Sequence, residues 1–251
     1  MDIAAFAAEA EVEKTHWWFV GRRRLFAKEL KQADLPHPAR VLDIGTGTGS
    51  TLRMLRDLGY SRVTGVDPSE EAIRYCAIKG LGPVINGSLP DLEFADGSFD
   101  FVFATDMLEH VDDDARGLRE IYRVLAPGSR SLITVPAFNA LWGLQDRQAF
   151  HKRRYRRRPL LALISAAGLV PLKSYYFNYL LFLPILLARR GIDLLGLELR
   201  SENEINSAAL NKVLGAVFRF DIMTAPIVRP PFGVSILVVA EKPAAPAPGP
   251  R

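Results

Sequence analysis

The feature that most constrains the fold is a glycine-rich turn near the start of the chain. The apolar segment Val41–Ile44 runs directly into Gly45, Gly47 and Gly49, and a segment of helical period follows. Glycine lets the backbone turn tightly and approach a ligand without a Cβ in the way, and a helix start offers free N–H donors. A dinucleotide-binding turn needs a third glycine at position 50, where this chain has Ser50. The turn therefore predicts a strand–turn–helix ligand site of another kind.

The chain beyond this turn alternates between two patterns. Short β-rich apolar runs are followed by segments with apolar side chains three or four residues apart, such as Leu52, Leu55 and Leu58. This alternation is typical of βαβ units in a parallel sheet. The predicted strands cover residues 41–44, 62–66, 83–86, 99–104, 131–135, 172–177 and 233–240. We therefore predict an α/β fold, a Rossmann-like, doubly wound and mostly parallel seven-stranded sheet with helices on both faces.

The segment between the last two predicted strands is too long for a structureless loop in a compact domain. A helical stripe indicates that it contains a helix, and its residues are Leu210, Val213, Leu214, Val217 and Phe218. We interpret this segment as a cap over the ligand-binding edge of the sheet. The predicted parts are an N-terminal helical or lid segment (1–38), a core (39–178), a helical cap insertion (179–228), the last core strand (229–242) and a disordered tail (243–251).

Composition excludes several classes of protein. With 49% hydrophobic and 24% charged residues, the whole chain is neither intrinsically disordered nor collagen-like. The single cysteine, Cys76, cannot form an internal disulfide, and the first thirty residues contain no apolar signal core. We therefore expect a cytoplasmic protein, with peripheral contact at the inner face of the membrane as an open alternative.

The run from Asp43 to Gly49 resembles the first motif of the class I S-adenosylmethionine-dependent methyltransferases. Four further stretches agree in order and spacing: Asp67 after the second strand, residues 87–88 with 94–100, residues 106–111, and residues 124–128. The resemblance implies S-adenosyl-L-methionine as the cofactor, although Ser88 stands where many relatives carry Asp. The binding residues that it implies are Asp43, Gly45, Thr46, Gly47, Gly49, Asp67, Pro68, Ser88, Leu89, Thr105 and Asp106.

A narrower resemblance lies outside these motifs. Two stretches are similar to a subgroup of bacterial methyltransferases whose acceptors are mostly unassigned. They are residues 13–19 with Arg22 and Arg23, and residues 141–142 followed by Asp146, His151, Arg153, Arg154 and Tyr155. The aromatic residues beside His16 would either close over the cofactor or acceptor, or pack in the core.

The reaction that the resemblance implies is in-line transfer of a methyl group, with a base where the acceptor is a hydroxyl. The candidate catalytic residues are His110, His16 and His151. His110 follows the fourth strand at the edge where ligands bind in such sheets, and His151 could be oriented by Asp146. No pair of His or Cys has ligand spacing, so we expect no metal site.

Charge is divided unevenly along the chain. The net charge is −5 over residues 1–140 and +9 over residues 141–251, and residues 152–158 are the densest basic cluster. This cluster is either a solvated helix start or a phosphate- or membrane-facing surface. An apolar run at residues 175–188 is too short to span a membrane and is interrupted by Pro184. The run is buried, or lines a pocket for an apolar acceptor, or lies in a membrane interface.

These patterns favour a methyltransferase for a small or lipid-linked apolar acceptor, acting at oxygen. Peripheral membrane contact through residues 152–190 is compatible with such an acceptor. An RNA methyltransferase is the alternative with the same chemistry, but no RNA-binding module is recognisable, so nucleic acid is not an expected partner. A non-catalytic, cofactor-binding partner subunit is the alternative from another class.

Overall fold

The computed structural model describes residues 10–195 and 207–244, so most of the tail predicted at 243–251 lies outside the described residues. The described elements are α2 (Trp17–Gln32), β1 (Val41–Ile44), α3 (Ser50–Asp57), β2 (Val63–Asp67), α4 (Glu70–Ile78), β3 (Val84–Asn86), β4 (Phe99–Thr105), a 3-10 turn (Leu108–His110), α5 (Asp114–Val124), β5 (Leu125–Pro136), a second 3-10 turn (Asn139–Leu141), α6 (Leu144–Gln148), α7 (Arg157–Ala166), β6 (Val170–Phe177), α8 (Phe182–Leu195), α9 (Ala208–Val228) and β7 (Ser235–Glu241).

The strands form one seven-stranded sheet in the order β3-β2-β1-β4-β5-β7-β6. The first five strands in this order are parallel, and β7 is antiparallel to both of its neighbours. The predicted fold class is confirmed. β5 begins six residues before the predicted start because Leu125 already pairs with Phe99 and Arg130 with Phe101, although this stretch has no apolar pattern.

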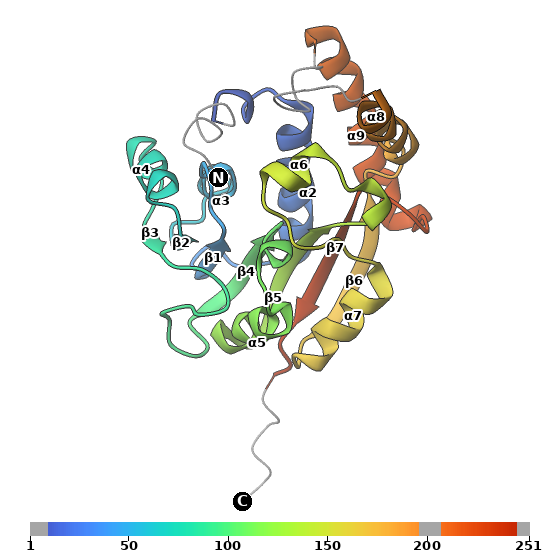
Figure 1. The fold of residues 1–251 in the computed structure, drawn as a ribbon. Helices are drawn as coiled ribbons and strands as arrows, with labels where there is room; N and C mark the ends of the chain where they lie inside the picture. Colours follow the sequence, from blue (N-terminus) through green and yellow to red (C-terminus); the bar gives the residue numbers. More distant parts are fainter. Residues whose placement is uncertain (1–9, 196–206, 245–251) are drawn as a thin grey trace, which may run out of the picture.

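Helices cover both faces of the sheet, as Figure 1 shows. Successive residues of β4 point to opposite sides: Val102 and Ala104 pack in the core beneath α5 and α7, whereas Phe101 and Phe103 pack beneath α2, α3 and α9. A parallel strand that is buried on both faces consists almost entirely of apolar residues, which explains the composition of β4.

The N-terminal helix α2 is part of this second layer. Leu25, Phe26 and Leu30 are buried against the sheet. The buried Glu29 carboxylate accepts hydrogen bonds from Lys173 Nζ at 2.7 Å and from the Tyr175 hydroxyl at 2.8 Å, both on β6. The helix α2, near the start of the chain, is thereby fixed to β6, an edge strand from the later part of the sequence.

The buried face of α9 differs in part from the predicted stripe. Leu210 and Val213 are exposed, by 38% and 59%, while Asp221, Ile222 and Ala225 are buried. The Asp221 carboxylate accepts hydrogen bonds from the main-chain N–H groups that follow β6, at residues 178 and 180. The apolar stripe misled the prediction at these positions because a polar side chain fixes the second half of α9 to the sheet.

Candidate cofactor and acceptor site

The carboxyl ends of the parallel strands meet at one edge of the sheet and carry the predicted site residues. Asp43 lies in β1, Asp67 ends β2 and Thr105 ends β4, with Asp106 directly after it. Ligands bind at this edge in open α/β sheets, at the point where the strand order reverses. That point lies between β1 and β4 here.

The glycine turn leaves one of its three glycines open to a ligand. All three have a positive φ, of 75° at Gly45, 54° at Gly47 and 85° at Gly49. A Cβ at Gly45 would collide with Met107, and one at Gly49 would collide with Leu81 and Cys76. A Cβ at Gly47 would meet no atom within 4 Å. Gly47 is therefore the position where a ligand can approach the backbone of the turn.

Thr46 serves the turn itself. Its hydroxyl donates to the main-chain oxygen of Asp43 at 3.1 Å, and its side chain is buried. The hydroxyl therefore stabilises the turn. Only the backbone of Thr46 is left to contact a cofactor.

The Asp67 carboxylate is positioned by main-chain donors. One oxygen accepts from the N–H of Gly47 at 2.8 Å and the other from the N–H of Ser69 at 2.9 Å. Burial raises the pKa of Asp67, and these two hydrogen bonds oppose the shift. Each carboxylate oxygen can accept more than one hydrogen bond, so Asp67 can also receive ligand hydroxyls beside the open Gly47.

Asp43 is a buried acid at this edge that no hydrogen bond of the described chain compensates. Its side chain is 1% exposed, and neither carboxylate oxygen has a hydrogen-bond partner within the described chain. Burial raises its pKa to about 8, the Asp67 carboxylate adds to the shift, and Arg22 opposes it. A buried carboxyl without a partner is costly, so this position suits a ligand that brings positive charge or hydrogen-bond donors.

The segment before α2 is bound to the glycine turn. The buried Glu13 carboxylate accepts from the Thr48 hydroxyl and from Lys79 Nζ, the latter at 2.7 Å. Arg23 donates to the Ser50 hydroxyl at 3.0 Å and to the Glu13 main-chain oxygen at 2.7 Å. Sequence reasoning missed these residues as site residues, because the side-chain contacts that join them to the turn span 27 to 66 positions.

Arg22 joins α2 to the end of β4. Its guanidinium forms an ion pair with Asp106 at 2.8 Å and lies over the rings of Trp18 and Phe26. The Trp18 ring stacks on Phe218 of α9 at a centroid distance of 5.3 Å. Of the two roles considered for these aromatic side chains, the observed contacts show core packing.

Two of the three candidate histidines lie together. The rings of His110 and His151 are 4.8 Å apart between centroids, and His151 Nδ1 is 2.9 Å from Asp146 Oδ1. Burial lowers the pKa of His110 to about 4, with His151 contributing. His16 instead caps α2, where its Nδ1 accepts from the N–H of Trp18 at 3.3 Å.

Asp146 is the anchor of this histidine pair. Its carboxylate accepts from Arg154 Nε at 2.7 Å and from the N–H of Gly143 at 2.8 Å. Burial acts to raise the pKa of Asp146, but the hydrogen bonds from His151 and Arg154 outweigh it and hold the pKa well below its usual range. Asp146 is therefore ionised and fixes the His151 ring.

Glu109, between β4 and α5, is a further site residue that the sequence prediction omitted. It is fully buried, and neither of its carboxylate oxygens has a hydrogen-bond partner among the described residues. Burial raises its pKa well above the usual value, with Asp106 adding to the effect. Its position next to His110 in the sequence was the available signal.

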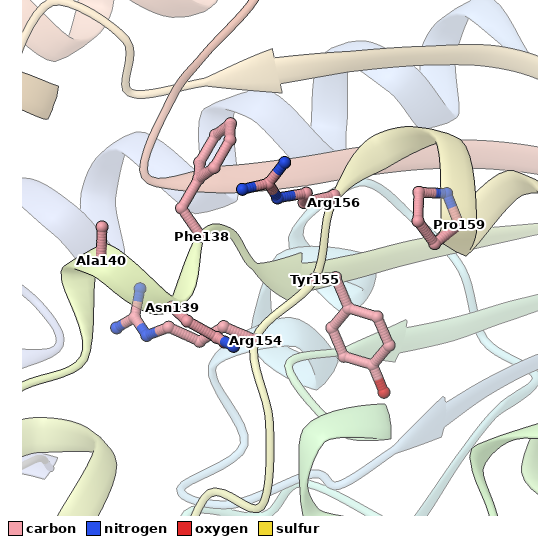
Figure 2. A pocket seen from close by; sticks show the side chains of 7 residues that line it. All are labelled: Phe138, Asn139, Ala140, Arg154, Tyr155, Arg156 and Pro159. Atoms are coloured by element: carbon pink, nitrogen blue, oxygen red, sulfur yellow. The ribbon is translucent and has the colours of Figure 1, made fainter.

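A hollow of about 330 Å³ opens beside the Asp146 network. Figure 2 shows the Arg156 guanidinium reaching toward the ring of Phe138, 6.0 Å away, while Tyr155 points away from both. Arg154 lines this hollow and also binds Asp146. No residue of the glycine turn lines it, so the hollow is distinct from the edge around Asp43 and Gly47.

Half of the six cations in the basic cluster at residues 152–158 form ion pairs within the chain. Lys152 pairs with Asp112 at 2.5 Å, Arg153 with Asp114 at 2.9 Å, and Arg154 with Asp146 at 2.7 Å. Three of its cations therefore already have carboxylate partners. This pairing weakens the interpretation of the cluster as a phosphate-binding surface.

Residues 42–133 match the family described as a methyltransferase domain. The chain carries a class I S-adenosylmethionine-dependent methyltransferase domain. Over 124 residues it is 32% identical to 2-methyl-6-phytyl-1,4-hydroquinone methyltransferase of Arabidopsis thaliana, covering 45% of this chain and 35% of the relative. Over 101 residues it is 37% identical to O-methyltransferase rstn1 of Aspergillus nomiae, covering 38% and 45%. The chain thus spans less than half the length of these curated relatives.

The fold of this methyltransferase domain extends beyond the matched region. The solved complex of the Haloferax volcanii Trm112 methyltransferase activator with a methyltransferase has a chain that superimposes with a TM-score of 0.62 at 22% identity. The superposition covers 97% of this chain and 96% of the other. At this identity the likeness establishes the fold and leaves the acceptor open.

The methyltransferase domain and its fold imply S-adenosyl-L-methionine as the cofactor, and the residues present fit it. The open backbone at Gly47, the carboxylate of Asp67 and the unpartnered carboxyl of Asp43 together offer acceptors to its hydroxyl and ammonium groups. The remaining predicted residues lie near this edge in different settings: Pro68 is exposed after β2, Ser88 is half-buried after β3, and Leu89 is buried in the core.

Proposed function

We propose that this chain transfers a methyl group from S-adenosyl-L-methionine to an oxygen of a small or lipid-linked apolar acceptor. The observation that carries the proposal is the edge at which Asp43, Gly47 and Asp67 converge with unused acceptor capacity and open space. When bound, the cofactor supplies an electrophilic methyl group. The chain binds and orients the two reactants. Holding them in the geometry of the reaction supplies a large share of the lowering of the activation barrier in such transfers.

The histidine pair supports an acceptor that must lose a proton. His151 binds Asp146 through Nδ1, so in the ion-free protein the lone pair of Nε2 can accept a proton from a hydroxyl. His110 lies against the same ring. The pair follows β4 and β5, at the same edge of the sheet as Asp106.

Exposed apolar side chains on the last two helices support an apolar acceptor. Leu183 and Leu187 of α8 are 59% and 68% exposed, and Phe220, Met223 and Ile227 of α9 are 57% to 81% exposed. Large exposed apolar surfaces mark interaction sites. The name of the Arabidopsis relative specifies a hydroquinone with a phytyl chain as its substrate. Among the described residues, none of the helices is long and apolar enough to cross a membrane.

The test of cofactor binding is calorimetric titration with S-adenosylmethionine and S-adenosylhomocysteine. We expect micromolar binding to the wild type and a loss of at least tenfold in Asp67→Ala, which corresponds to about 1.4 kcal/mol. Asp57→Ala, at an exposed position on α3, is the matched control and should bind normally. Absence of binding to the wild type would overturn the proposal.

The test of the acceptor class combines methyl transfer to a lipid-tailed phenol with co-sedimentation on anionic vesicles. We expect both to decrease in Leu187→Glu and to persist in Ile78→Glu, which changes an exposed isoleucine on α4. Cofactor binding without transfer to any hydroxyl acceptor would favour a non-catalytic partner subunit. Binding to RNA that weakens steeply with salt would favour an RNA methyltransferase.

A further inference from the structure

Three potential metal ligands converge after β4. Glu109, His110 and His151 each direct one donor atom into a common space, and these atoms all lie within 4.8 Å of one another. Glu109 and His110 belong to the 3-10 turn after β4, and His151 belongs to the segment after α6. A separation of about 40 positions in the sequence concealed this grouping, which is why ligand spacing predicted no metal site.

Glu109 is the acid in this neighbourhood that has no cationic partner at hydrogen-bond distance. Asp106 pairs with Arg22 at 2.8 Å, and Asp146 pairs with Arg154 at 2.7 Å. Glu109 is 0% exposed, and both of its oxygens are unpartnered within the described residues. A buried carboxylate without compensation is costly unless it is paired, protonated or bound to a metal.

His151 is oriented in the manner of a metal ligand. Its Nδ1 donates to the Asp146 carboxylate, which can only accept, so the lone pair lies on Nε2. This Nε2 is 4.0 Å from Glu109 Oε1, beyond hydrogen-bond distance. Metal-binding histidines commonly hold a carboxylate at the other ring nitrogen, which fixes the tautomer and raises the basicity of the ligand. Asp146 is a positioning residue in this arrangement.

We propose that Glu109, His110 and His151 bind a divalent transition-metal ion of the zinc or cobalt class. Two imidazoles and one carboxylate favour such ions over magnesium or calcium, which prefer oxygen ligands. Ligand atoms about 2.1 Å from a tetrahedral ion lie about 3.4 Å from one another. Since the three donor atoms lie within 4.8 Å of one another, side-chain rotations that move them by roughly 1 Å bring them to this separation. The fourth position remains open to a water molecule. Use of this position by an acceptor oxygen would rest on the proposed function, and the bound ion would then replace the lone pair of His151 Nε2 in promoting loss of the hydroxyl proton. Ion binding itself does not rest on that function.

The test uses the metal alone, without cofactor or acceptor, on protein freed of metal with a chelator. Titration with Co²⁺ should give one equivalent bound, with a visible absorption band of a cobalt site that has nitrogen ligands, and Zn²⁺ should displace it. Glu109→Gln and His151→Ala should each weaken binding by 100-fold or more. His37→Ala, which removes an exposed imidazole stacked on Tyr60, should leave it unchanged.

Thermal unfolding separates a lost ligand from a lost fold. Zn²⁺ should raise the melting temperature of the wild type and of His37→Ala, but not that of a folded Glu109→Gln or His151→Ala protein. Absence of a cobalt band in the wild type, or binding that survives both ligand substitutions, would overturn the proposal. Because no methyl donor or acceptor is present, failure of methyl transfer leaves this result unaffected.

Discussion

A buried acid such as Asp43 links the stability of the cofactor-free protein to pH. In the unfolded chain its carboxyl ionises above about pH 4, whereas burial raises its pKa to about 8 in the folded protein. Between these values the unfolded state binds fewer protons than the folded state. The contribution of Asp43 to the free energy of unfolding therefore falls as pH rises from about 4 to about 8.

We predict that Asp43→Asn stabilises the cofactor-free protein at pH 7.5 and weakens S-adenosylmethionine binding. Asparagine has no proton to lose, so the gain in free energy of unfolding should be of order 1–3 kcal/mol at pH 7.5 and nearly absent at pH 4. Urea unfolding at the two pH values measures it. Asp57→Asn, on the exposed side of α3, serves as the control. A gain of equal size at both pH values would contradict the prediction.

The glycines of the turn should respond differently to the same substitution. Gly47→Ala places a methyl group in open space, so its cost to stability should be limited to the backbone strain of a positive φ, about 1–2 kcal/mol. Cofactor affinity should fall at least tenfold. Gly49→Ala should cost more stability, because its Cβ would lie 2.7 Å from Leu81 Cδ1 and 2.9 Å from Cys76 Sγ. Denaturant unfolding and calorimetric titration of both variants check this; normal cofactor binding by Gly47→Ala would count against the site.

A glycine lies at the contact between α2 and α9. Gly21 is buried, and a Cβ there would lie 2.1 Å from the Phe218 ring. Trp17 and Trp18 pack on the same ring from the adjacent turn of α2. The glycine therefore sets the distance between the two helices that cover this face of the sheet.

This packing predicts a strong coupling between the two helices. Gly21→Ala should lower the free energy of unfolding by about 1–3 kcal/mol through overpacking. Phe218→Leu alone should also destabilise by creating a cavity. The double variant should lose at least 1 kcal/mol less than the sum, because the smaller side chain makes room for the methyl group. Additive losses in urea unfolding would show that the helices separate instead.

For the molecule as a whole, the N-terminal helix and the sheet form one packing unit. Phe26 contacts Phe103 of β4, and Glu29 binds Lys173 of β6. Arg22 pairs with Asp106 at the ligand edge. The sequence predicted this segment as a helical or lid segment. In the structure its apolar side chains pack on the central strands, and its Arg22 forms an ion pair at the ligand edge.

We predict a single unfolding transition that includes α2. Two of the three tryptophans, Trp17 and Trp18, lie in α2, so their fluorescence reports on this helix. In a Trp142→Phe variant, the fluorescence midpoint in urea should coincide with the midpoint of far-ultraviolet circular dichroism. A fluorescence transition at clearly lower urea would show that α2 unfolds as an independent lid.

Much of the cofactor edge could be predicted from the sequence because its determinants are local. The run from Asp43 to Gly49 needs only consecutive residues to form a strand, a turn and a helix start. The observed β1 covers the same residues, 41–44, as the predicted strand. The stripe on α9 was less reliable, because apolar spacing alone does not show that Asp221 faces the sheet. Helical periodicity identifies the helix but does not decide which neighbour covers it.

The sequence by itself determined the fold class, the sheet edge at which ligands bind and the cofactor that the motif implies, since each depends on short-range pattern and connection rules. Only the tertiary structure decided the long-range pairings. It brought Glu13 to Thr48 and Lys79, and it brought His151 to Glu109 and Asp146. These contacts depend on how loops from different strands pack at one edge of the sheet. The spacing of residues along the chain does not encode the distance in space between such loops.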